Sequence, residues 1–488
     1  MEYLVVIIYF ISLLFIFLFS LGQLHLTWHY LRKKNNGPSL PSDQIGEVNL
    51  PKVTVQLPIY NELYVVERLL DAVTSIEYPS EKLEIQVLDD STDETSSLIE
   101  NKINQLEYKK LEIKHIKRQD RENYKAGALQ HGLAEAKGDL IAIFDADFLP
   151  EKDFLFKTVM HFKDPKLGVV QTRWGHLNND YSILTKLQAF GLDAHFSIEQ
   201  KGRNKAGSFI NFNGTGGVWR KDCIIDAGGW SADTLTEDLD LSYRAQLKGW
   251  KFRYLEEVVT PAELPILMPA IKSQQFRWNK GAAETARKNL GKVLGSKISF
   301  SNKFHAFFHL LNSSVFVFLL IAALLSIPML FIKNTHPFVS SLFYTGSVFL
   351  IGFFSIAVFY YVATKQFHPK NTLLYFLKTF PLFLTFSMGL ALHNSFAVLE
   401  GIFGFKSPFI RTPKFNITSK SDSWKGNKYI QLKISPLTLA EGVLCLYFIF
   451  GVVAGFILQD YGLIIFHLML ALGFASVFFF SLRPINYA

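Results

Sequence analysis

Two apolar stretches flank a polar middle region, and this distribution constrains the fold more than any other feature of the chain. Tyr3–Phe19 is almost wholly apolar, Val53–Lys303 has the pattern of a globular domain, and Phe304–Leu482 consists mostly of long apolar runs. With 49% hydrophobic and 19% charged residues and a mean hydropathy of +0.19, the chain of 488 residues is too apolar for a soluble enzyme and too charged for a wholly embedded protein. The sequence therefore predicts a water-soluble domain inserted between membrane-spanning helices.

The first apolar run, residues 3–22, is predicted to be an uncleaved transmembrane anchor. Glu2 precedes it where a signal peptide would carry basic residues, and no small-x-small cleavage site follows. Arg32, Lys33 and Lys34 come after the run, so the positive-inside rule places the middle domain, residues 50–290, in the cytosol. We expect an integral protein of a plasma or inner membrane, or of the Golgi in a eukaryote. Much of the net charge of +8 lies beside apolar runs, which favours membrane orientation over nucleic-acid binding.

The C-terminal region, residues 305–482, contains four clear spans, since a bilayer needs about 20 apolar residues. They are Phe307–Phe331, Phe338–Tyr361, Leu437–Ile457 and Tyr461–Phe480. A further run, residues 373–399, is interrupted by His393 and Asn394. If it crossed, the loop of residues 401–435 would lie outside, although this loop carries seven cations against Glu400 and Asp422. We therefore expect residues 373–399 to form an interfacial or re-entrant helix, with the loop in the cytosol and five spans in total.

The middle domain alternates predicted strands with predicted helices. The strands lie in Val53–Glu62, Leu83–Thr95, Leu111–Arg118 and Asp139–Phe148, and the helices in Leu63–Val73, Asp93–Leu106 and Lys125–Lys137. This spacing is typical of βαβ units and predicts an α/β domain with a mostly parallel sheet. Ligands of such sheets bind at the carboxyl ends of the strands.

Acidic residues gather at those strand ends. Asp89 and Asp90 end the second strand, and Asp145 and Asp147 end the fourth. A single acid after a strand is most often a turn former, but paired acids after two strands are harder to explain in that way. The domain has neither a Walker A sequence nor a Gly-x-Gly-x-x-Gly motif to hold phosphate. The paired acids therefore predict a binding site for Mg²⁺ or Mn²⁺, in which the metal holds the diphosphate of a nucleotide.

Four motifs in order carry a resemblance to a known family. They are Asp89-Asp90, Asp145-Ala-Asp147, Thr236-Glu237-Asp238 and the Gln274–Trp278 segment that includes Arg277. The set resembles the processive family 2 glycosyltransferases, which comprise the cellulose, chitin and hyaluronan synthases and join a cytosolic GT-A domain to membrane helices. "FNGTGGVWR" (Phe212–Arg220) and "DAHFSIEQ" (Asp193–Gln200) look closer to the cellulose-synthase-like mannan and glucan synthases. "FNITSK" (Phe415–Lys420) resembles the gating segment of cellulose synthases.

The resemblance implies a role for each matching residue. The residues expected to bind the donor are Asp89, Asp90, Lys125, Asp145 and Arg277. The residues expected to bind the metal are Asp145 and Asp147. The residues expected to bind the acceptor are Phe212, Asn213, Gly214, Thr236, Glu237, Gln274 and Trp278. Asp238 is the expected catalytic base. Cellulose synthases carry a histidine where this chain has Asn123, which departs from the pattern next to Lys125.

Glycosyl transfer chemistry is compatible with these assignments. A metal and Arg277 can neutralise the departing diphosphate, Asp238 can accept the hydroxyl proton, and the Trp278 ring offers a face on which a sugar can stack. Thr236 and Glu237 also suit a helix start.

The leading hypothesis is a processive, inverting synthase of a β-linked polysaccharide. The alternatives are a glycolipid synthase that adds one sugar to a membrane lipid, and a transporter or scaffold with an inactive domain, which the intact acid set disfavours. UDP-glucose, GDP-mannose and UDP-N-acetylglucosamine all fit as donors.

Overall fold

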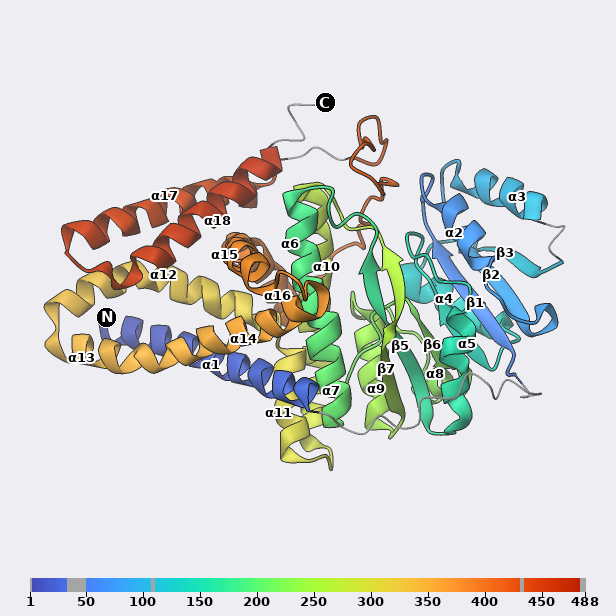
Figure 1. Cartoon of the computed structure of the whole chain (residues 1–488), viewed down its shortest axis with the longest axis horizontal. Coiled ribbons are helices and arrows are strands. Elements are labelled where there is room, and N and C mark those ends of the chain that lie inside the picture. The colour runs from blue at the N-terminus through green and yellow to red at the C-terminus, as the bar shows by residue number, and fades with distance from the viewer. Residues whose placement is uncertain (1, 33–49, 107–109, 431–433, 483–488) are drawn as a thin grey trace.

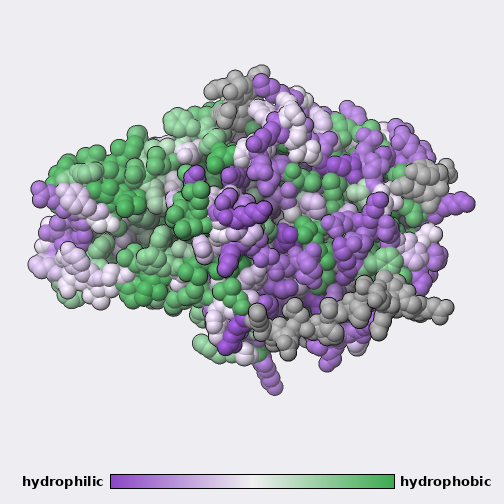
Figure 2. Space-filling view, in the orientation of Figure 1, coloured by the Kyte–Doolittle hydropathy of each residue, from purple (hydrophilic) through white to green (hydrophobic). Residues whose placement is uncertain are grey.

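The chain forms two parts of contrasting surface, as the computed structural model shows (Figure 1). It describes residues 2–32, 50–106, 110–430 and 434–482, so Lys33, Lys34 and Lys433 of the topology prediction lie outside the described residues. An α/β domain occupies one end of the long axis, and a bundle of helices occupies the other. Figure 2 shows hydrophobic residues concentrated over the helical part and hydrophilic residues over the α/β part. The predicted architecture, an α/β domain flanked by apolar helices, is confirmed.

A seven-stranded sheet forms the centre of the α/β domain, in the order β3-β2-β1-β4-β6-β5-β7. Its strands are β1 (Val53–Ile59), β2 (Leu83–Asp89), β3 (Glu112–Lys117), β4 (Leu140–Ile143), β5 (Leu167–His176), β6 (Gly217–Arg220) and β7 (Lys251–Ala262). The short β6 is antiparallel to both of its neighbours, β4 and β5, and the remaining pairs are parallel. The sheet is thus mixed and mostly parallel, as predicted.

The register brings the acid-bearing strand ends to one edge. Ile59 of β1 pairs with Asp89 of β2, and Val53 of β1 pairs with Leu140 of β4. β5 and β7 run parallel to each other and end together at His176 and Ala262. Because parallel strands share a direction, the residues that follow these strands meet at the same edge.

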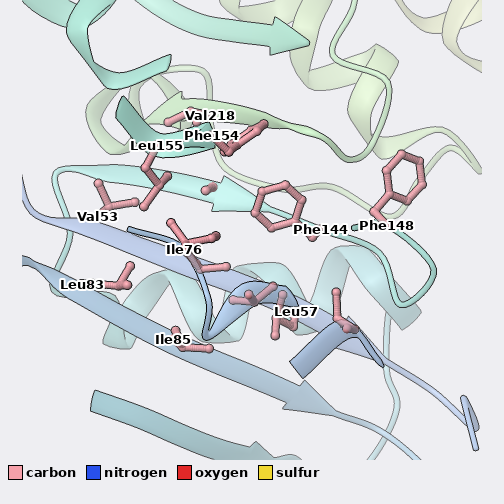
Figure 3. Packing of buried hydrophobic residues seen from close by; sticks show 14 of the residues in the cluster. Val53, Leu57, Ile76, Leu83, Ile85, Phe144, Phe148, Phe154, Leu155 and Val218 are labelled. Carbon is pink, nitrogen blue, oxygen red and sulfur yellow. The ribbon is translucent and has the colours of Figure 1, made fainter. Parts of the chain in front are cut away.

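Helices cover both faces of the sheet, which explains why its central strands are continuous apolar runs. On one face lie α2 (Val66–Val73), α3 (Thr95–Leu106) and α5 (Phe154–Val159). Figure 3 shows the core of this face, to which Leu57 of β1 and Ile85 of β2 belong together with Phe144, whose ring lies 4.9 Å from the Phe154 ring of α5. The other face packs against α4 (Tyr124–Glu135), α8 (Lys221–Asp226) and α9 (Glu237–Leu247).

Two longer helical segments connect the sheet with the apolar bundle. α6 (Ile183–Ala194) continues through the π-helical turn η4 (His195–Gln200) into α7 (Lys201–Ala206). α10 (Met268–Gly295) follows β7 and leads into α11 (Phe300–Leu310). α10 packs against α9 on the side of the sheet and against α16 (Ala391–Phe403) on the side of the bundle.

Six helical segments of the described residues are long and apolar enough to cross a membrane. They are α1 (Glu2–Leu31), α12 (Ser314–Thr335), the α13–α14 segment (Pro337–Phe367), α15 (Thr372–Gly389), α17 (Pro436–Ile457) and the segment Tyr461–Leu482, which contains α18 (Ile464–Leu482). In Figure 1, α15 is seen nearly end-on, whereas α1, α12, α14 (Leu350–Phe367), α17 and α18 run lengthwise. α15 thus lies across the direction of the other five.

Two boundaries in the bundle differ from the sequence-based ranges. α11 ends at Leu310 and α12 begins at Ser314, whereas the expected span starts at Phe307. His305 and His309 of α11 are buried, and the Nδ1 of His309 lies 2.8 Å from the Tyr243 hydroxyl of the α/β domain. α11 therefore belongs to the junction between the two parts. The run of residues 373–399 forms two helices, α15 and α16, that meet at Leu390.

Candidate active site

One pocket opens at the carboxyl edge of the sheet, and it collects most of the predicted site residues. It is lined by Asp90, Lys125, Asp145, Asp147, Asn213, Gly214, Thr236, Glu237, Asp238, Gln274, Arg277 and Trp278. These residues come from the ends of β2 and β4, from α4, α9 and α10, and from the loop before β6. Segments up to 188 positions apart, from Asp90 to Trp278, therefore converge as the motif order predicts.

Two predicted residues lie behind the pocket lining. Asp89 is buried, and its carboxylate accepts a hydrogen bond from the Ser91 backbone N–H at 2.9 Å and lies 2.8 Å from Nε2 of His115. Its contacts brace the turn that presents Asp90. Phe212 is fully buried in the core, where its ring meets the Trp219 ring edge-to-face at 5.5 Å. Phe212 therefore anchors the loop that carries Asn213 and Gly214 instead of reaching the pocket.

The acids at the strand ends each have a cationic partner. Asp90 pairs with Arg118, whose Nε donates to Oδ1 at 2.9 Å. Asp145 accepts from Nζ of Lys125 at 2.6 Å.

The Lys125 ammonium bridges two sides of the pocket. Its Nζ also donates to the carbonyl oxygen of Gly214 at 3.0 Å. Burial alone would lower the pKa of Lys125, but the carboxylates of Asp145 and Glu237 outweigh burial and raise it. Lys125 is therefore held as a cation between the strand ends and the loop before β6.

A basic segment that follows α16 closes one side of the pocket. Its residues Phe409, Arg411, Thr412 and Lys414 line the pocket. Lys414 donates to Oδ2 of Asp147 at 2.7 Å.

Arg411 of this segment meets Glu62, which follows β1, with Nη1 at 2.7 Å from Oε2. Burial, with a contribution from Asp147, raises the pKa of Glu62 to about 7 despite Arg411 and Lys414. The signals for this segment in the sequence were its basic composition and the FNITSK resemblance. Arg411 and Lys414 precede that motif, and their partners are more than 260 positions away.

Asp238 occupies the start of α9, where it differs from the strand-end acids. Its Oδ1 accepts the Leu239 backbone N–H at 2.8 Å, and it forms no ion pair among the described residues. Burial and, next, the neighbouring Glu237 raise the pKa of Asp238 to about 7. Gly214 makes room for this carboxylate, because a Cβ there would lie 3.0 Å from Oδ2 of Asp238, and its φ of +80° suits glycine. Asp238 has the properties of a general base.

The N-terminal half of α10 contributes the remaining wall. Gln274, Arg277 and Trp278 follow the three- and four-residue spacing that places side chains on one helix face. Nη2 of Arg277 donates to the Thr412 hydroxyl at 2.9 Å, and burial lowers the pKa of this guanidinium although acids surround it. The helix can approach α9 closely because residue 281 is glycine; a Cβ there would lie 2.8 Å from the backbone nitrogen of Thr236.

Four further residues line the pocket that sequence reasoning missed. The Arg121 guanidinium lies over the Tyr60 ring at 3.3 Å, beside Asp90, and offers a flat surface next to the nucleotide residues. Trp174 and His176 end β5, and the Trp174 ring lies 6.4 Å from the Trp278 ring. Trp174 and His176 could have been predicted as site residues from their position at the end of a strand.

The acid pair Asp145 and Asp147 fits a divalent cation. Both carboxylates line the pocket, and both attract a lysine ammonium in this structure, which marks the two positions as strongly electronegative. Mg²⁺ and Mn²⁺ prefer carboxylate oxygen and complete their coordination with substrate phosphates. The donor set is therefore suitable for the expected cofactor.

Comparisons with known proteins relate this chain to glycosyltransferases. The profile "Glycosyltransferase like family 2" matches residues 51–281, which contain the sheet and α9 and extend into α10. The chain is 42% identical over 282 residues to "Probable glucomannan 4-beta-mannosyltransferase 4" of Oryza sativa subsp. japonica, covering 57% of this chain and 51% of that protein. It is 41% identical over 259 residues to "Glucomannan 4-beta-mannosyltransferase 9" of Arabidopsis thaliana, covering 52% and 49%. The chain thus spans about half the length of the curated relatives it matches.

A solved structure shares the fold. It is the mannosyltransferase PcManGT of Pyrobaculum calidifontis, in complex with GDP-Man and Mn²⁺, which aligns with a TM-score of 0.56 at 19% identity over 83% of this chain and 99% of that one. Residues 51–281 thus match the family 2 glycosyltransferase profile, and the chain is similar to the glucomannan 4-beta-mannosyltransferases over about half of its length.

Proposed function

We propose that this protein is an inverting, membrane-integrated glycosyltransferase that transfers mannosyl units from GDP-mannose to a growing β-linked polysaccharide. The observation that carries the proposal is the meeting, in one pocket, of the strand-end acids, Asp238 and the Gln274–Trp278 segment. The mannosyl specificity rests on relatives that are 41% and 42% identical in this domain and are named glucomannan mannosyltransferases. Among the three donors compatible with the sequence, GDP-mannose is the one that carries mannose.

Binding of the donor is assigned to the strand-end side of the pocket. Asp90 and Arg121 would contact the nucleoside, since both line the end of the pocket where Tyr60 supplies a ring. Lys125 and Arg277 would approach the diphosphate as fixed cations. Asp145 and Asp147 would hold Mg²⁺ or Mn²⁺, which when bound neutralises charge on the leaving diphosphate.

Transfer is assigned to Asp238. An acceptor hydroxyl attacks the anomeric carbon, the bond from that carbon to the diphosphate oxygen breaks, and the hydroxyl proton passes to the Asp238 carboxylate. A single displacement on the face opposite the leaving group inverts the anomeric configuration. Because its pKa is raised to about 7, the Asp238 carboxylate accepts a proton more readily than an ordinary carboxylate does.

Retention of the product is assigned to the α10 side of the pocket. The Trp278 and Trp174 rings provide two aromatic surfaces for sugar rings, and Gln274 adds a polar group. α10 and α16 connect this wall to the apolar bundle, which supports the passage of a growing chain towards the membrane.

The proposed topology has five spans and a cytosolic active site. α15 lies across the lengthwise helices in Figure 1, which favours an interfacial α15 over a sixth span. The basic segment from Gly404 to Ile430 pairs with Glu62 and Asp147, and this supports its location on the same side as the catalytic domain. A cysteine introduced at the exposed Lys420 should resist an impermeant thiol reagent outside intact cells. External labelling would contradict this topology.

Product analysis tests the function directly. Membranes containing the protein are incubated with labelled GDP-mannose, UDP-glucose or UDP-N-acetylglucosamine, and products are separated by size and extracted with organic solvent. We expect long chains from GDP-mannose that β-mannanase degrades, without an added lipid acceptor. A lipid that carries a single sugar as the sole product would replace the polysaccharide proposal by the glycolipid alternative.

A further inference from the structure

The segment Asp193–Gln200 lies directly behind the acceptor side of the pocket. Its residues do not line the pocket, but they contact residues that do. Oδ1 of Asp193 lies 3.0 Å from Nε2 of His176, and the Phe196 ring lies 4.8 Å from the Trp174 ring.

Gln200 makes the most specific of these contacts. Its side chain is fully buried, and its Nε2 donates to Oδ1 of Asn213 at 2.8 Å and to Oδ1 of Asn211 at 3.0 Å. On its other side, Nδ2 of Asn213 lies 3.4 Å from Nε2 of His195. The backbone N–H of Asn213 donates to Oε1 of Gln171 at 2.9 Å. Both ends of the Asn213 amide, as well as its backbone, are therefore held in place.

The hydrogen-bond directions in this network fix the orientation of the Asn213 amide. Because Gln200 donates to Oδ1 of Asn213, the Nδ2 of Asn213 must donate to His195. His195 then accepts at Nε2 and carries its proton on Nδ1, which donates to Oε2 of Glu199 at 2.9 Å. The second N–H of Asn213 has no hydrogen-bond partner among the described residues, and it stays available for a ligand because Asn213 lines the pocket.

The π-helical geometry explains how one short segment reaches Asn213 from two positions. In an α-helix, residues five positions apart point about 140° away from each other around the axis. In a π-helix, the hydrogen bonds join residues five positions apart, so the side chains of His195 and Gln200 come to the same side. An uninterrupted α-helix would leave one of these two contacts unmade.

A buried ion pair stabilises the far side of the network. Nη2 of Arg203 donates to Oε1 of Glu199 at 2.8 Å, and Nη1 of Arg203 donates to the His305 carbonyl at 3.1 Å. Burial alone would raise the pKa of Glu199, but Arg203 and His195 outweigh burial and hold that pKa below its ordinary value. Glu199 thus remains an acceptor for the His195 N–H.

We infer that the π-helical turn is a positioning device for acceptor recognition, in which Gln200 and His195 orient the Asn213 amide so that it donates a hydrogen bond to a hydroxyl of the acceptor sugar. This inference rests on the proposed function, and it assigns a role to residues that do not touch the substrate. Turning the Asn213 amide leaves the contacts of the donor residues with this loop in place, because Lys125 binds the Gly214 carbonyl, the Asp145 backbone N–H binds the Thr215 hydroxyl, and neither contact involves the Asn213 side chain.

The test uses the full-length protein in membranes and compares the KM for a β-1,4-linked manno-oligosaccharide with the KM for GDP-mannose. Gln200→Glu keeps the side-chain size but replaces the donating amide by an acceptor, so the Asn213 amide must turn around. We expect an acceptor KM raised about tenfold, the effect of one lost hydrogen bond, with a donor KM changed less than about twofold. His195→Ala should give the same split with a smaller effect, because its contact with Asn213 is longer.

Gln188→Ala is the matched control. Gln188 lies on α6, and its amide donates to the carbonyls of Leu184 and Pro265 at 3.0 and 2.9 Å without reaching the pocket. It should leave both KM values unchanged.

Equal changes in both KM values for Gln200→Glu, or the same split in the control, would overturn the inference, and so would an unchanged acceptor KM. If Gln200→Glu fails to accumulate in membranes, His195→Ala decides by the same criterion. A wild-type protein that makes no polymer from any donor contradicts the proposed function instead. In that case, manno-oligosaccharide binding followed by tryptophan fluorescence still compares the variants with the wild type.

Discussion

The acids of the pocket fall into two groups that differ in their neighbours. Those at the strand ends pair with cations, as Asp145 does with Lys125 and Asp147 with Lys414. Asp238, at the start of a helix, forms no ion pair among the described residues, and burial raises its pKa to about 7. An ion-paired carboxylate is positioned to hold a ligand or a metal, whereas the buried Asp238 carboxylate, which forms no ion pair among the described residues, can exchange a proton near neutral pH. The fold thus separates binding from proton transfer.

The largest effect is expected from Asp238→Asn, which removes the base and keeps the shape of the side chain. Transfer should fall by about 10²–10⁴-fold, the usual contribution of a positioned general base, because the amide cannot accept the hydroxyl proton. GDP binding, followed by calorimetry, should stay near the wild-type value, since the strand-end acids are untouched. A variant that retains most of its turnover would remove Asp238 as the base.

A smaller but still large effect is expected from Asp147→Asn on the other side of the comparison. A bound metal contributes several kcal/mol of charge stabilisation, so a weakened metal site should reduce transfer by about 10²-fold. Electron paramagnetic resonance of Mn²⁺ should show weaker metal binding in the variant. Full wild-type activity after chelation of divalent cations would contradict a metal-dependent mechanism.

The pH dependence of kcat/KM reports the protonation of the free enzyme and separates the two groups again. A raised pKa means that the protonated form of Asp238 is favoured, so the base is lost as the pH falls through about 7. Below that value we expect kcat/KM to drop about tenfold per pH unit. Glu237→Gln removes the negative neighbour of Asp238 and should move this limb to lower pH.

Glu62→Gln is the control for this profile, because Glu62 also has a pKa of about 7. It should leave the limb in place. A limb that disappears in Glu62→Gln and persists unshifted in Glu237→Gln would assign the titration to Glu62.

The strand-end group was predictable from the sequence, because each acid directly follows an apolar strand. Parallel strands must bring such ends together, so the sequence alone places Asp90 and Asp145 in one site. The pairing of Asp147 with Lys414 could not be predicted, because it joins positions 267 residues apart through a segment without regular structure. The same holds for Phe212, whose motif predicted an acceptor contact although its ring completes the core.

The helical bundle also has features that the sequence predicts and features that it does not. Hydropathy identified the apolar runs, since a helix in a membrane needs only length and composition. Hydropathy could not predict that α11 is separate from α12. α11 is held at the junction by the buried contact of His309 with Tyr243, and this contact is a tertiary interaction. Likewise, the π-helical turn at His195 depends on its packing against the loop before β6 and has no periodicity in the sequence by which it could be recognised.

The smallest effect is expected at the contact of α10 with the start of α9, which carries Asp238, and two glycines of α10 allow a matched test. A Cβ at residue 281 would lie 2.5 Å from Cγ2 and 2.8 Å from the backbone nitrogen of Thr236, whereas a Cβ at residue 291 would meet nothing within 4 Å. Gly281→Ala should therefore push α10 away from the start of α9 by a few tenths of an ångström. Since a misplacement of about 1 Å can reduce the rate about 10²-fold, we expect transfer to fall by about threefold to tenfold.

Gly291→Ala is the matched control. It should leave transfer unchanged and stabilise the helix by about 0.5–1 kcal/mol, the usual gain for alanine over glycine. Turnover and the thermal unfolding midpoint of both variants, measured in detergent, check the pair. Equal turnover in the two variants would mean that the spacing between Asp238 and Trp278 does not limit transfer.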